Sequence, residues 1–215
     1  MHATALLFDL DGVLVDSVQC VRSVCTDWAL AHSLDPEFVL RSGQGRRVQD
    51  TVRAVAPHLD LETEVARLVA MEAQTTDGLY PIEGASELLA ALPPNAWAVV
   101  TSGAREVATL RLRYVGLPIP GTLITADDVS QGKPHPEGYL AAARALGRTP
   151  SDCVVIEDAP PGIEAAIAAG MRSIGIAGTF AAADLSRATA VLPSLAAMRI
   201  NATPDGGHLE IGWQL

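Results

Sequence analysis

Short apolar runs alternate with longer amphipathic stretches along most of this chain. The apolar runs are bounded by turn residues and lie at residues 3–8, 96–100, 122–125, 153–156, 173–176 and 190–192. Such runs predict buried strands. Helical periodicity lies between most of them, at residues 84–91, 105–115, 137–146 and 163–169, the last followed by a glycine suited to a helix C-terminus. The alternation predicts an α/β fold with a doubly wound parallel sheet.

One segment interrupts this alternation. From residue 17 to about residue 76 the pattern is helical without an evident strand, and Tyr80-Pro81 returns the chain to the α/β pattern. We therefore expect a Rossmann-like core of residues 1–16 and 80–215, with a small α-helical cap, residues 17–79, inserted after the first strand. Near the end, partly alternating runs flank the turn-rich residues 204–207, which predicts a hairpin within residues 200–213.

Composition narrows the class of protein. Hydrophobic residues make up 49% of the chain and aromatic residues 4%, which suits aliphatic helices packed on a parallel sheet. The formal net charge is -10 at pH 7 and no Lys or Arg run is dense enough to follow a phosphate backbone, so nucleic acid is not expected as a partner. The cysteines, Cys20, Cys25 and Cys153, show no CxxC spacing, which argues against a disulfide framework and a zinc site; Cys153 is expected to be a small buried residue.

The sequence also predicts a cytoplasmic location. No apolar stretch reaches the roughly 20 residues that span a bilayer, so no membrane association is expected. The first predicted strand begins at about Ala3, which leaves no room for a signal peptide.

Acidic residues follow two of the predicted strands. Asp9 and Asp11 come after the first strand, and Glu157 and Asp158 come after a later one. Carboxyl ends of parallel strands share one edge of a sheet, so we expect these acids to gather there with Lys133, which the flanking Gly and Pro residues aim inward. Carboxylates this close either take up protons or bind a hard cation, and oxygen ligands favour Mg²⁺. The pattern predicts metal-assisted phosphoryl transfer.

The spacing of Asp9 and Asp11 suits a nucleophile and an acid. In extended chain both side chains point the same way, and Gly12 then lets the backbone turn away. Asp9 can bind metal and attack phosphorus, while Asp11 can reach the leaving-group oxygen. Two aspartates separated by one residue are also common in solvated turns. The evidence for an active site therefore comes from the predicted strand before them and the glycine after them.

Four segments resemble, in order, the motifs of the haloacid dehalogenase superfamily. They are residues 8–17, 99–103, 132–136 and 156–159, and the resemblance covers about residues 4–180. It implies a phosphate site made by a strand-end hydroxyl, the N–H groups after it and a lysine: Thr101, Ser102, Gly103 and Lys133. It implies Mg²⁺ held by the aspartates of the first and fourth motifs, Asp9, Asp11 and Asp158, with Glu157 steering a metal-bound water.

Asp11 distinguishes two branches of this superfamily. Dehalogenases expel a halide and lack the second aspartate, whereas phosphatases need an acid to protonate an alkoxide. The resemblance therefore implies that Asp9 is the covalent nucleophile. It further implies that Asp11 protonates the departing alcohol and then activates the water that hydrolyses the aspartyl phosphate.

The inserted helices resemble the cap of the phosphoglycolate phosphatase and β-phosphoglucomutase branch, which closes over the site. Arg46 or Arg47, just before a predicted helix at residues 48–56, is expected to hold substrate hydroxyls or phosphate; the alternative is two solvated arginines. The sequence around these motifs resembles most the phosphatases that act on small sugar and polyol phosphates. Gln44 replaces a histidine found in many relatives, and Val21 stands about where the mutases carry a histidine.

The expected protein is thus an Mg²⁺-dependent phosphatase, a monomer or weak homodimer, acting on a small phosphorylated metabolite. Phosphoglycolate phosphatase, a β-phosphoglucomutase-like phosphotransferase and a binding protein without turnover remain alternatives. Four residues also have a possible structural role in place of a catalytic one: Ser102 as a helix N-cap, Lys133 as a surface lysine, Asp158 as a capping acid, and His135 as a structural residue.

Overall fold

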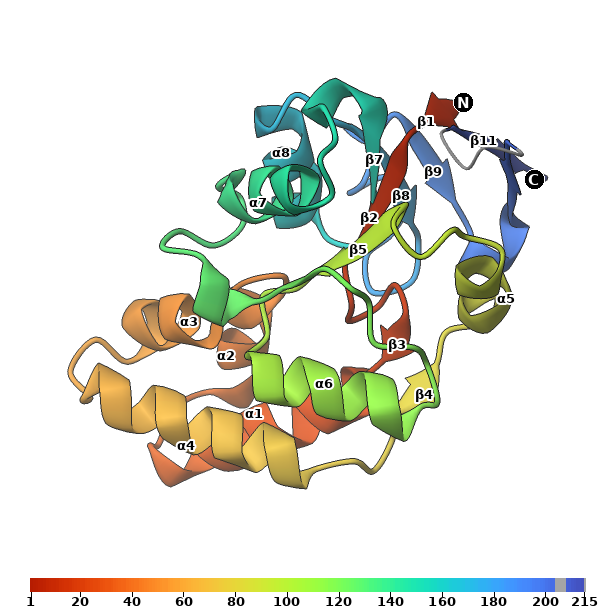
Figure 1. Ribbon diagram of the computed structural model, residues 1–215. Coiled ribbons are helices and arrows are strands. Elements are labelled where there is room, and N and C mark those ends of the chain that lie inside the picture. The colour runs from red at the N-terminus through yellow and green to blue at the C-terminus, as the bar shows by residue number, and fades with distance from the viewer. Residues whose placement is uncertain (204–207, 215) are drawn as a thin grey trace.

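A parallel sheet organises the core of the protein. The computed structural model describes residues 1–203 and 208–214, and six of the strands in that part form this sheet in the order β6-β5-β2-β7-β8-β9 (Figure 1). The strands are β2 (Ala5–Phe8), β5 (Trp97–Val100), β6 (Leu123–Ile124), β7 (Cys153–Glu157), β8 (Arg172–Ile176) and β9 (Ala190–Leu192). Counted along the chain, this order is doubly wound and reverses direction between β2 and β7. The predicted fold class is confirmed.

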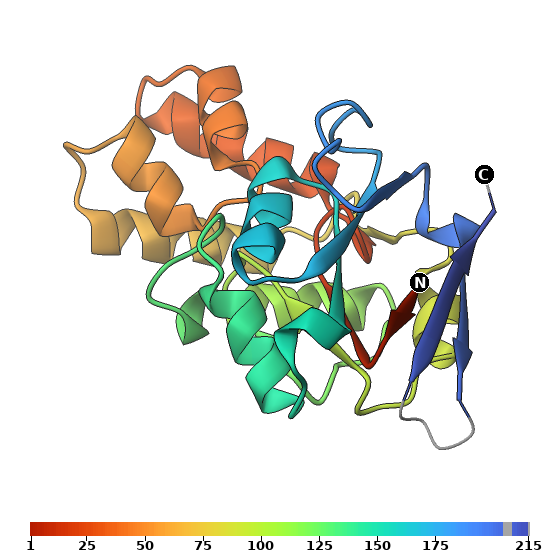
Figure 2. The same cartoon turned by 90° about the horizontal axis from the view of Figure 1, so that it is seen from above.

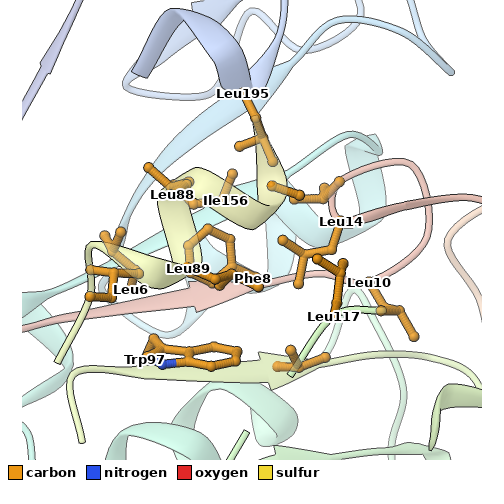
Figure 3. Close-up of a cluster of buried hydrophobic side chains, with 14 of the residues drawn as sticks. Leu6, Phe8, Leu10, Leu14, Leu88, Leu89, Trp97, Leu117, Ile156 and Leu195 are labelled. Carbon is orange, nitrogen blue, oxygen red and sulfur yellow. The ribbon is translucent and has the colours of Figure 1, made fainter. Parts of the chain in front are cut away.

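Helices cover both faces of this sheet because its central strands are apolar on both sides. On one face, Leu7 and Val155 belong to a core cluster that includes residues of α7 and α8. On the other, Leu6, Phe8 and Trp97 form a cluster with residues of α5 and α6 (Figure 3). These helices are α5 (Ala85–Ala90), α6 (Arg105–Tyr114), α7 (Glu137–Ala145) and α8 (Pro160–Ala168).

The inserted segment has a core of its own. Within residues 18–74, all of which are described, four α-helices form: α1 (Val18–Ala31), α2 (Pro36–Gly43), α3 (Val48–Val55) and α4 (Leu61–Gln74). Trp28 is 1% exposed and clusters with Val39 and Leu68. Asp35 and Asp60 cap α2 and α4 by accepting hydrogen bonds from backbone N–H groups of the first turn. The helical insertion is confirmed, while residues 17–79 as the limits of a cap remain a prediction.

Two short strands, β3 (Val15–Asp16) and β4 (Tyr80–Pro81), pair antiparallel where the chain leaves the core and returns to it. This pairing places the entry to the insertion beside its exit. The sheet edge that carries the predicted acids therefore faces the inserted helices (Figures 1 and 2).

The ends of the chain form a second sheet. β10 (Met198–Ala202) pairs antiparallel with β11 (Leu209–Trp213), which confirms the hairpin, although its expected turn at residues 204–207 lies outside the described residues. β11 also pairs with β1 (His2–Ala3), which brings the first residues of the chain beside the hairpin (Figure 2). The strand predicted for residues 3–8 is therefore confirmed only for Ala5–Phe8, which pair with the central sheet, while Ala3 pairs with the hairpin. The break falls at Thr4, whose N–H donates to Asp152 O at 2.7 Å.

The described helices include none that is both long and apolar enough to cross a membrane. Cys153 is fully buried at the start of β7, as the sequence predicted for a small apolar side chain.

Candidate active site

Three acids and a lysine meet where β2 and β7 end. Asp9 follows β2, Glu157 ends β7 and Asp158 follows it, and the two strands are parallel neighbours. One carboxylate oxygen from each of the three acids lies within 4.8 Å of the other two. Lys133 Nζ donates to Asp9 Oδ1 at 2.5 Å and to Glu157 Oε1 at 2.6 Å. The sheet edge thus gathers these four residues, as the strand pattern predicted.

The buried surroundings shift the pKa values of Asp9, Asp158 and Lys133. Burial raises the pKa of Asp9 well above the usual value, although Lys133 acts in the opposite direction. It also raises the pKa of Asp158 to about 7, with a further contribution from Glu157. Burial lowers the pKa of Lys133, but Asp9 and Glu157 more than offset this, so that pKa lies well above its ordinary value. Lys133 therefore stays charged, and the raised pKa values of Asp9 and Asp158 show that one ammonium is not enough to stabilise both aspartates in the ionised form.

Glu157 is engaged by hydrogen bonds on both carboxylate oxygens. Oε1 accepts from Lys133 Nζ and from Tyr139 OH at 3.0 Å, and Oε2 accepts from the backbone N–H groups of Asp158 and Ala159 at 2.9 and 3.0 Å. These bonds hold the loop that carries Asp158. The carboxylates left to bind a cation are those of Asp9 and Asp158, and oxygen ligands of this kind suit Mg²⁺.

Asp11 lies outside that group and is bound elsewhere. Its Oδ1 accepts from Ser17 Oγ and from Arg111 Nη1, each at 2.7 Å. Arg111 lies on α6 and donates through Nη2 to Glu72 Oε2, on α4, at 2.9 Å. Neither Arg111 nor Glu72 was predicted from the sequence as a residue of the site. The available signal was the position of Arg111 in the buried stripe of α6, next to Ala108 and Leu112.

The residues after β5 approach the same edge, because β5 is the other neighbour of β2. Thr101 is 6% exposed, and its Oγ1 accepts from the N–H of Gly103 at 3.0 Å. Ser102 Oγ donates to Gly45 O, in the inserted segment, at 3.1 Å. The N-cap of α6 is Ala104, so the alternative of Ser102 as that helix's N-cap is wrong.

A cavity of about 220 Å³ lies between the core and the inserted helices. Its lining has a polar side from the core and an apolar side from the insertion. The polar side includes Asp9, Asp11, Asp158, Thr101, Ser102 and Gly103; the apolar side includes Val21, Trp28, Val39, Leu40 and Leu68. The cavity can therefore enclose a small molecule with one charged end.

The two neighbouring arginines have different surroundings. Arg46 lines the cavity. Arg47 is 4% exposed and binds the Asp50 carboxylate together with the carbonyls of Val129 and Ser130 in the core. Arg47 thus joins the insertion to the core and does not reach the cavity, and the alternative of two solvated arginines fails for it.

Comparison with known proteins agrees with this geometry. A family model described as haloacid dehalogenase-like hydrolase matches residues 3–170. Hexitol phosphatase A of Escherichia coli strain K12 is 38% identical over 211 residues, which cover 96% of this chain and 98% of that protein. Glycerol-1-phosphate phosphohydrolase 2 of Saccharomyces cerevisiae is 39% identical over 193 residues, 84% of this chain and 77% of that protein.

Solved structures give the same result. A hydrolase from Pseudomonas syringae superimposes with a TM-score of 0.79 at 28% identity, over 90% of this chain and 94% of that one. β-Phosphoglucomutase from Clostridium difficile, at 22% identity and a TM-score of 0.76, covers 90% of this chain and 92% of its own and shares the fold. This chain belongs to the haloacid dehalogenase-like hydrolase family.

Proposed function

We propose that this chain is an Mg²⁺-dependent phosphatase that hydrolyses small sugar or polyol phosphate monoesters through an aspartyl-phosphate intermediate. The observation that carries the proposal is the buried pair of Asp9 and Asp158 at the polar end of the cavity, with Lys133 bound to Asp9. Relatives named as a hexitol phosphatase, a glycerol-1-phosphate phosphohydrolase and a 2-deoxyglucose-6-phosphate phosphatase support the substrate class.

In this proposal Asp9 is the nucleophile. Lys133 holds its Oδ1, and among the described residues no donor lies on Oδ2, so that oxygen is free to attack phosphorus. Asp11 protonates the departing alcohol and later takes a proton from the attacking water. Thr101 and the N–H groups after it, with Lys133, bind the phosphate oxygens.

Asp9 and Asp158 are the residues that would hold Mg²⁺, because their buried carboxylates lie close together while Lys133 pairs with Asp9 and Glu157. The sequence also predicted Asp11 as a metal ligand, but its side chain binds Arg111 and Ser17. When bound, the ion supplies positive charge to the phosphate oxygens as charge develops on them. Glu157 contributes by fixing Lys133 and the Asp158 loop.

The insertion acts as a cap that selects the organic part of the substrate. Arg46 lines the cavity, where it can hold hydroxyls or phosphate, while Ser102 and Arg47 join the cap to the core. Val21 also lines the cavity, about where the mutases carry a histidine, which favours hydrolysis over intramolecular transfer. The expected partner remains a small phosphorylated metabolite.

A phosphate-release assay over a panel of phosphorylated sugars, polyols and phosphoglycolate tests the proposal. Wild-type protein is expected to release phosphate only with Mg²⁺ and to show its highest kcat/KM on a sugar or polyol phosphate. Asp9→Asn is expected to abolish release while leaving the circular-dichroism spectrum unchanged, and Asp27→Asn, at an exposed position in α1, serves as the control. A panel without release by folded wild-type protein in Mg²⁺ would refute the phosphatase, and conversion of a hexose 1-phosphate to its isomer would identify a mutase.

A further inference from the structure

Arg111 is a buried arginine shared by a core acid and a cap acid. Its residue exposure is 2%, and it lies on the core helix α6. Nη1 donates to Asp11 Oδ1 and Nη2 donates to Glu72 Oε2, at 2.7 and 2.9 Å. Asp11 lies in the loop after β2, and Glu72 lies on the cap helix α4, which packs against α6. One guanidinium therefore joins the proposed proton donor to the cap.

The contact with Arg111 helps to determine which carboxylate oxygen of Asp11 is free to bind a ligand. Both donors to Asp11, Arg111 Nη1 and Ser17 Oγ, bind the same oxygen, Oδ1. Within the described residues no donor occupies Oδ2, so this oxygen is available to a ligand in the cavity that Asp11 lines. The planar guanidinium donates to Asp11 through Nη1 and to Glu72 through Nη2, so the contact with Glu72 fixes the direction of the donor to Asp11.

Glu72 limits the freedom of Arg111. It lines the cavity and is half of a buried ion pair, with side-chain exposures of 3% for Arg111 and 12% for Glu72. The Nε of Arg111 has no partner in the described part of the chain, so the two acids are the charged groups that orient the guanidinium, with the Cys20 side chain beside it. If α4 moves away from α6, Arg111 loses one of those two contacts.

We propose that Arg111 is a positioning residue for Asp11, and that Glu72 holds Arg111 in place when the cap lies against the core. This inference rests on the proposed phosphatase function. It predicts that the alignment of the proton donor depends on the contact that Arg111 on α6 makes with Glu72 on α4. Proton transfer needs the donor within hydrogen-bond distance of the leaving-group oxygen, and a misplacement of about 1 Å costs up to about 10²-fold in rate.

The dependence of rate on the leaving group separates positioning from general structural damage. An alkyl phosphate such as glycerol 1-phosphate needs a proton on the departing alcohol, whereas p-nitrophenyl phosphate releases a stable phenolate without one. Arg111→Met is expected to lower kcat/KM for the alkyl ester by about tenfold or more relative to that for the aryl ester. Asp11→Asn marks the full size of this selective loss.

Two further variants control for folding and for cap attachment. Arg111→Met leaves Glu72 buried without its partner, so the double variant Arg111→Met/Glu72→Leu removes both charges and is expected to fold with the same selective loss. Arg47→Met breaks the other buried arginine contact between cap and core without touching Asp11. It is expected to lower the rates on both esters by the same factor.

These experiments distinguish a failure of the positioning role of Arg111 from a failure of the proposed phosphatase function. If wild-type protein cleaves both esters but the folded Arg111 variants lose both rates equally, as Arg47→Met does, the positioning role is overturned. If wild-type protein with Mg²⁺ cleaves neither ester, the phosphatase proposal fails instead. Glu72→Gln is expected to produce a selective loss smaller than that of Arg111→Met; no change in the alkyl-to-aryl ratio would remove Glu72 from the proposal.

Discussion

We expect Gly162→Ala to destabilise the protein, although replacing a glycine within a helix by alanine usually stabilises it. Alanine in a helix interior is more stable than glycine by roughly 0.5–1 kcal/mol, because glycine loses more conformational freedom on folding. Gly162 lies in the first turn of α8, above the side chain of Glu157. An alanine Cβ at this position would overlap Glu157 Oε1 and Cδ and lie 2.7 Å from its Cγ.

Glu157 cannot move aside without loss. It is 1% exposed and accepts hydrogen bonds from Lys133, Tyr139 and two backbone N–H groups. Losing one charged hydrogen bond costs about 1.5–3 kcal/mol, and overpacking costs about 1–3 kcal/mol. After subtraction of the helix gain, we expect a decrease of about 1.5–5.5 kcal/mol in the free energy of unfolding. Phosphate release should also fall, because Glu157 holds the loop of Asp158.

Urea unfolding followed by circular dichroism measures this change through the midpoint and the slope m. Gly121→Ala is the matched control, because no heavy atom lies within 4 Å of the position its Cβ would take. Its stability should stay within about 0.5 kcal/mol of the wild type. A Gly162→Ala protein as stable and as active as wild type would show that Glu157 is not held as tightly as its contacts imply.

The remaining predictions concern the charged groups of the site. Because burial raises the pKa of Asp158 from 3.8 to about 7, the folded metal-free protein keeps a proton there that the unfolded chain releases. The free energy of unfolding should therefore fall as pH rises through that interval, and Mg²⁺ should raise Tm more near pH 8 than near pH 5.5, with a smaller difference in Asp158→Asn; an equal shift at both pH values would contradict this. Lys133→Met leaves Asp9 and Glu157 without their shared ammonium, so urea titration without Mg²⁺ should show a loss of about 3–5 kcal/mol, and added Mg²⁺ should recover part of it; unchanged stability would argue against the buried pair. Arg46→Met should raise KM for a sugar phosphate roughly tenfold with a smaller change in kcat, and an unchanged KM would exclude Arg46 from substrate binding.

The sequence by itself determined the class of fold and the identity of the central site. Strands buried on both faces are recognisable as apolar runs, and the residue that follows each run can be identified directly from the sequence. Asp9 and Asp158 follow two predicted strands, so their convergence followed from the rule that parallel strands share a carboxyl edge, whereas Thr101 was identified through the resemblance of its segment to a family motif. Lys133 was found because its flanking Gly and Pro residues mark a turn within the chain itself.

The tertiary structure alone decided which charged residues outside the motifs are buried. Arg111 meets Asp11 across 100 positions and Glu72 across 39, and nothing in the neighbours of either residue in the sequence indicates these pairs. The choice between Arg46 and Arg47 depended on which one the core loop at Val129 could reach. The sign of the Gly162→Ala effect depends on the closeness of the Glu157 side chain. In each case the reason is physical: the free energy of a buried charge or an added methyl depends on atoms that only folding brings within contact distance.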